Sequence, residues 1–99
     1  MNTNAIIVQA CHNAANARLI AARAGVDVRD ECADAFRAGK EKGCGDLMEA
    51  AHTAYMMARV VAEKARAIRA GKGNVEYMRN GLPALACSAA FAAGRAAAF

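Results

Sequence analysis

The sequence predicts a small all-α fold, a bundle of four main helices plus one short helix, and two observations support that fold class. Alanine, which has the highest helix propensity and is depleted in strands, makes up 28 of the 99 residues. Glycines recur at the intervals at which helices end, because glycine is favoured just past a helix C-terminus. A chain of this length predicts one domain over residues 1–99.

The first expected helix covers residues 4–24 and ends at Gly25. On a helical wheel its apolar side chains share one side, which indicates an amphipathic helix with that side toward the core. The apolar set is Ile7, Val8, Cys11, Ala15, Leu19 and Ala22, whereas Ile20 lies on the polar side.

The second expected helix begins after Asp27, a good N-cap residue, and ends at Gly39. Its buried residues are expected to be Val28, Cys32, Ala35 and Phe36. Residues 39–45 then predict a flexible charged loop, because three glycines alternate there with lysine and glutamate.

The third expected helix is the longest and covers residues 47–70, between a cap at Asp46 and a terminating Gly71. Asp46 with Glu49 three residues on resembles a capping box. A strip of small side chains predicts close approach of a neighbouring helix. That strip is Leu47, Ala51, Ala54, Ala58, Ala62 and Ala65.

A short helix is expected over residues 75–80, ending at Gly81, and a last helix over residues 83–97, with Pro83 in the first position that proline favours. The last helix carries one charge, Arg95, and is otherwise apolar on every side. Such a helix is central in its fold or contacts another copy of the chain, so self-association through it is a further expectation. No internal repeat is evident in the sequence.

The composition gives a formal net charge of +4, which we interpret as a mild excess spread along the whole chain. Four cysteines without a secretion signal predict reduced thiols and a cytoplasmic protein. The longest uncharged run, residues 80–94, is too short to span a bilayer, so we expect no membrane partner.

No metal, cofactor or catalytic residue is expected. The four cysteines and two histidines lack the spacing of zinc ligands, and cysteines 11, 32 and 87 fall among apolar residues, where a free thiol packs as a small hydrophobic group. Cys44 differs because it lies between two glycines of the expected loop and next to a helix N-terminus. That setting predicts an exposed thiol, the first to be labelled by a thiol reagent.

Four acidic residues form a ridge at the start of the second expected helix, and their spacing sets them on one solvent-facing side. An acidic ridge on a positively charged chain favours the orientation of a basic partner. The expected partner-binding residues are Asp27, Asp30, Glu31 and Asp34.

An alternative surface is basic and surrounds the end of the third expected helix, where it would suit nucleic acid. The seven-residue loop between the second and third helices is too long for a helix-turn-helix motif. The alternative nucleic-acid-binding residues are Arg59, Arg66, Arg69, Lys72 and Arg79.

These features favour a non-enzymatic protein that acts by stoichiometric binding to a protein partner, one belonging to a larger complex, as an inhibitor or adaptor. The more specific expectation is a phage or mobile-element accessory that blocks a bacterial defence complex, in the manner of an anti-CRISPR protein. The alternative is a nucleic-acid-binding regulator that uses the basic end of the long helix.

Overall fold

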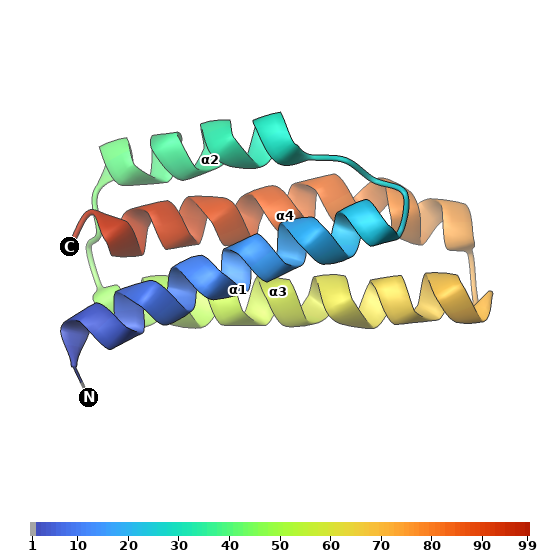
Figure 1. Cartoon of the computed structure of the whole chain (residues 1–99), viewed down its shortest axis with the longest axis horizontal. Helices are drawn as coiled ribbons and strands as arrows, with labels where there is room; N and C mark the ends of the chain where they lie inside the picture. Colours follow the sequence, from blue (N-terminus) through green and yellow to red (C-terminus); the bar gives the residue numbers. More distant parts are fainter. Residues whose placement is uncertain (1) are drawn as a thin grey trace.

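The structure, a computed structural model, describes residues 2–99 and is all-helical there, as predicted. Four helices follow one another along the chain: α1 (Thr3–Arg23), α2 (Arg29–Lys42), α3 (Leu47–Ala70) and α4 (Val75–Ala97). They pack into a compact body with a radius of gyration of 13.2 Å (Figure 1).

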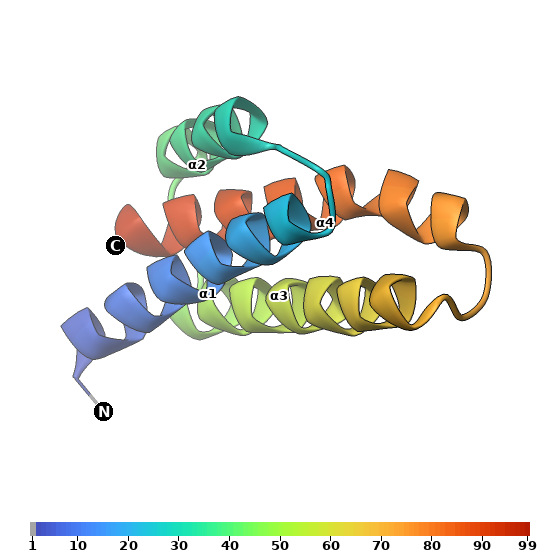
Figure 2. The same cartoon turned by 45° about the vertical axis from the view of Figure 1, so that its right-hand side comes forward.

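Helix α4 lies at the centre of the bundle and packs against each of the other three helices. Helices α1 and α3 also pack against each other, whereas α2 packs mainly on α4 and lies on the side of it away from α3 (Figure 2). Helices α2 and α4 run in the same direction, opposite to α1 and α3. The apolar character of α4 on all sides is therefore explained within the chain and no longer argues for self-association.

The buried side of α1 differs from the predicted one. Its four buried residues are all alanines: Ala10, Ala14, Ala17 and Ala21. Larger residues of the predicted side are partly or largely exposed, with Val8 at 52% and Leu19 at 42% exposure, while Ile20 packs against the core from the side predicted to be polar. Small side chains bring α1 close to both α3 and α4, so its larger apolar residues are left at the margins of these contacts.

Helix α2 does not end at Gly39 but continues to Lys42, and Gly39 is buried. A Cβ atom at this position would overlap the backbone carbonyl of Phe91 in α4. Gly94 of α4 has the reciprocal relation, because its Cβ atom would overlap the carbonyl of Phe36 in α2. Gly39 therefore allows the close crossing of α2 and α4, and it does not end α2.

The two segments that cross here form a short internal repeat, contrary to the expectation from the sequence. Residues 32–40 of α2 and 87–95 of α4 share five identical residues in the same order, and both segments end in a basic residue. The shared residues are Cys32 and Cys87, Ala35 and Ala90, Phe36 and Phe91, Ala38 and Ala93, and Gly39 and Gly94. Each glycine of the repeat thus lies against the backbone of the phenylalanine in the other segment.

Helix α3 has the predicted ends. The Asp46 side chain accepts hydrogen bonds from the backbone N–H groups of Met48 and Glu49, and Gly71 adopts the left-handed conformation that closes the helix. The predicted small-residue strip is only partly right. The buried residues of α3 are Ala50, Ala54, Val61, Ala65 and Ile68, so the strip is displaced and includes two larger side chains. Val61 and Leu82 are the largest fully buried residues of the described chain.

The predicted short helix over residues 75–80 is wrong as a separate element, because α4 continues without a break through Pro83 (Figure 1). Proline at this position removes one backbone N–H group, which would otherwise donate to the carbonyl four residues earlier. The remaining hydrogen bonds and the packing of α4 on three neighbours outweigh that loss. Asn74 caps α4, since its side chain accepts a hydrogen bond from the Tyr77 N–H.

Candidate functional site

The four predicted partner-binding acidic residues all lie at the surface, at the start of α2. Asp27, Asp30 and Glu31 line one small depression together with Arg29. Asp27 accepts a hydrogen bond from the Arg29 backbone N–H at 3.1 Å. Arg29 brings one positive charge to the lining of this depression.

Asp34 lies one turn further along α2 and pairs with Arg37, with an N–O distance of 3.0 Å. Both side chains are largely exposed, so water and salt screen this pair strongly. Three carboxylates of the ridge, those of Asp27, Asp30 and Glu31, therefore surround one depression, whereas Asp34 is paired with Arg37 of the same helix.

The alternative basic residues are all exposed, in the second half of α3 and around the start of α4. Arg59 pairs with Glu63 at 3.4 Å. Arg79 donates from Nε to the carbonyl oxygen of Ala24 at 3.3 Å, so it ties the start of α4 to the end of α1. Within residues 2–99, the other three, Arg66, Arg69 and Lys72, form no ion pair.

The charge excess is not spread along the chain as expected. Residues 59–79 contain six lysines and arginines against two glutamates, whereas the rest of the chain has seven basic and seven acidic residues. The formal charge of +4 therefore equals that of this one segment, which comprises the second half of α3 and the start of α4 (Figure 1).

Cys44 is buried, which contradicts the exposed loop thiol predicted from its glycine neighbours. Gly43 and Gly45 both have positive φ angles, and these fold the short connection back onto the bundle. Cys11 and Cys87 are half-buried and Cys32 is buried. In the part of the chain that the structure describes, no group of three or more His, Cys, Asp or Glu side chains could hold a metal ion.

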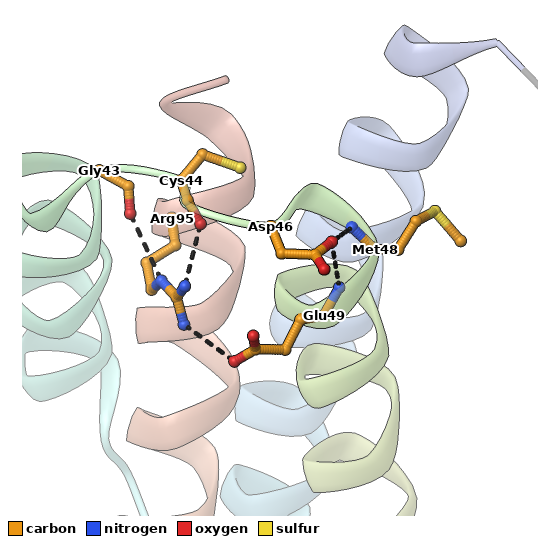
Figure 3. Close-up of polar contacts among 6 residues, drawn as sticks. All are labelled: Gly43, Cys44, Asp46, Met48, Glu49 and Arg95. Carbon is orange, nitrogen blue, oxygen red and sulfur yellow. Dashed lines mark hydrogen bonds and ion pairs between the residues drawn. The ribbon is translucent and has the colours of Figure 1, made fainter.

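Arg95 of α4 holds the connection between α2 and α3 in place (Figure 3). Its guanidinium donates from Nε to the carbonyl of Gly43 at 3.4 Å and from the second terminal nitrogen to the carbonyl of Cys44 at 2.9 Å. The remaining nitrogen lies 3.7 Å from a carboxylate oxygen of Glu49. The single charge of the last predicted helix thus has a structural role, which the sequence pattern did not indicate.

A groove between α1 and α3 is the surface feature that the sequence analysis missed. It has a volume of about 250 Å³ and no Lys, Arg, Asp or Glu in its lining. The lining residues are Ile6, Gln9, Ala10, Asn13, Met48, Ala51, His52 and Tyr55. Met48 is 60% exposed and Tyr55 is 49% exposed. The absence of charged residues from positions 3–17 could have indicated this groove, because an exposed helix face normally carries charged residues.

No protein-family model, curated protein or solved structure shows a significant match to this chain. No helix within residues 2–99 combines the length and the apolar composition that crossing a membrane requires.

Proposed function

We propose that this chain is a non-enzymatic helical protein that acts by stoichiometric binding to another protein, as an inhibitor or adaptor. The observation that carries the proposal is the uncharged groove between α1 and α3, which leaves Met48 and Tyr55 largely exposed. The centres of protein interfaces are enriched in tyrosine and methionine and depleted of charged residues. The groove has that composition.

Tyr55 is the residue on which we expect binding to depend most. Tyrosine is enriched among the few interface residues whose truncation costs about 2 kcal/mol or more, which corresponds to a loss of more than about tenfold in affinity. The polar groups of Gln9, Asn13 and His52 border the apolar floor and offer hydrogen bonds that fix the orientation of the partner.

The acidic ridge has a different role in this proposal. Asp27, Asp30 and Glu31 are exposed carboxylates, and charges of this kind steer association more than they add affinity. Replacing Asp30 and Asp34 by lysine is expected to slow association at low salt without changing the helical circular dichroism spectrum. Equal association rates for this variant and the natural chain would remove the ridge from the interface.

The groove is tested by recovering partners from lysate of the source organism with the natural chain and with two matched variants. Tyr55→Asp adds a charge in the groove, and Tyr77→Asp makes the same change at a tyrosine that is 71% exposed and outside the groove. We expect a stoichiometric partner to be lost with Tyr55→Asp and retained with Tyr77→Asp. A partner that both variants retain would contradict binding through the groove.

Within this class, the more specific proposal is an inhibitor from a phage or mobile element that blocks a bacterial defence complex. It is tested by the identity of the recovered partner.

Nucleic-acid binding is the second candidate, and the concentration of the charge excess in residues 59–79 favours it. Arg66, Arg69 and Lys72 supply the exposed cations without ion-pair partners in residues 2–99. A gel shift with arbitrary DNA or RNA that weakens steeply with salt, and that Arg66→Glu with Arg69→Glu abolishes, would support it. Absence of a shift at low salt would reject it.

A further inference from the structure

Cys32 of α2 and Cys87 of α4 occupy equivalent positions in the repeated segment, each seven residues before its crossing glycine. The two helices run in the same direction and meet at Gly39 and Gly94. Seven residues correspond to about two helical turns, so the cysteines lie on the contact side of their helices, at the same distance from the crossing. The repeat and the parallel packing together bring the two cysteines face to face.

Both cysteines belong to the larger core cluster, Cys32 as a buried member and Cys87 as a partly buried residue packed against it. Cys32 and Cys87 are neighbours in this cluster, since Cys87 is one of the groups that act on the Cys32 thiol. Burial, followed by the neighbouring Cys87 thiol, raises the pKa of Cys32 to about 12. Cys32 is therefore a poor nucleophile on its own at neutral pH.

Cys87 is the more exposed member of the pair, since it is half-buried whereas Cys32 is buried. It lines an open cavity of about 420 Å³ together with Ala35, Phe91 and Arg95. The cavity borders the α2–α4 contact, so a small molecule bound in it lies next to Cys87.

We propose that Cys32 and Cys87 form an oxidation site, at which a small-molecule disulfide such as oxidised glutathione converts the two thiols into an intramolecular disulfide between α2 and α4. The Cys87 thiolate attacks the reagent, forms a mixed disulfide and releases one glutathione thiolate. Cys32 gives its proton to solvent and attacks the Cys87 sulfur, which releases the second glutathione thiolate. The protein loses two electrons and two protons, and the reagent is reduced to two thiols.

The cross-link acts on the least supported helix of the bundle. Helix α2 packs mainly on α4 and buries two residues, Cys32 and Gly39. A bond between Cys32 and Cys87 also closes a long chain loop, which restricts the unfolded state. Oxidation therefore links α2 covalently to the centre of the fold and raises the melting temperature by roughly 10 to 30 °C.

The test incubates the natural chain with oxidised glutathione and analyses it by intact mass, peptide mapping and thermal melting. We expect a product lighter by about 2 Da, a single cross-linked peptide that contains Cys32 and Cys87, and a higher melting temperature that dithiothreitol reverses. Cys11→Ala with Cys44→Ala keeps only the proposed pair and is expected to give the same product. Cys87→Ala is the matched control and is expected to give none.

Three results would overturn the proposal. The first is a product in which glutathione stays attached to Cys87 while Cys32 remains reduced. The second is a cross-link that involves Cys11 or Cys44, or a second copy of the chain. The third is formation of the expected cross-link with an unchanged or lower melting temperature, since that would show that the bond does not suit the contact of α2 with α4.

Discussion

Replacing Gly39 by alanine tests the close crossing of α2 and α4. Glycine in a helix interior costs about 1 kcal/mol relative to alanine, so on propensity alone Gly39→Ala stabilises the protein. The added Cβ atom, however, overlaps the Phe91 carbonyl and approaches the Arg95 backbone nitrogen. Both obstacles are backbone atoms of the central helix and cannot rotate away as a side chain would.

Overpacking of a well-packed core costs typically about 1 to 3 kcal/mol, and backbone obstacles place Gly39→Ala at or above the upper end of that range. After subtraction of the propensity gain, we expect a net loss of about 2 kcal/mol in the free energy of unfolding. In a domain of this size each kcal/mol lowers the melting temperature by about 4 to 8 °C, so the expected decrease is roughly 8 to 16 °C.

Thermal and urea melts followed by circular dichroism measure this effect, and Gly81→Ala supplies the matched control. Gly81 is also inside α4, but its Cβ atom would meet no heavy atom within 4 Å beyond its own helix backbone. Gly81→Ala is therefore expected to stabilise by up to about 1 kcal/mol. If the two variants change stability in the same direction and by similar amounts, the close crossing is refuted.

Two further predictions concern the connection between α2 and α3 and the cysteines around the bundle. Arg95→Met leaves the carbonyls of Gly43 and Cys44 without their donor and is expected to cost about 1 to 3 kcal/mol in urea melts, whereas the exposed Arg37→Met changes stability by less than about 0.5 kcal/mol. Under a short pulse of iodoacetamide, peptide mapping is expected to find Cys87 labelled ahead of the buried Cys44, and the reverse order would show that the connection opens in solution.

The presence of the helices and most of their ends could be predicted from the sequence, because residues close to each helix end determine where it begins and ends. Asp46 caps α3, Gly71 closes it, and Asn74 caps α4, each through hydrogen bonds or backbone angles within a few residues. The exposure of the acidic ridge was predictable for the same reason, since the four-residue spacing of Asp30 and Asp34 is a property of one helix.

The errors occurred where distant contacts outweigh local preference. Gly39 and Pro83 resemble helix boundaries in the sequence, yet both lie inside helices. The close crossing with α4 requires glycine at position 39, and the packing of α4 on three neighbours outweighs the hydrogen bond lost at Pro83. Cys44 is buried because Arg95, 51 residues away, binds its carbonyl and holds the connection against the bundle. The groove between α1 and α3 joins residues about 40 positions apart, so no local pattern in the sequence outlines it.

The peripheral position of α2 has a consequence for hydrogen exchange. Unfolding this helix breaks one main interhelical contact, whereas unfolding α4 breaks three. The backbone amides of α2 are therefore expected to exchange through local opening, at a lower free energy than those of α4, which exchange only when the whole bundle unfolds. Helix α2 can thus unfold locally and refold while α1, α3 and α4 stay folded. A partner that changes the conformation of this protein would need the least free energy at α2.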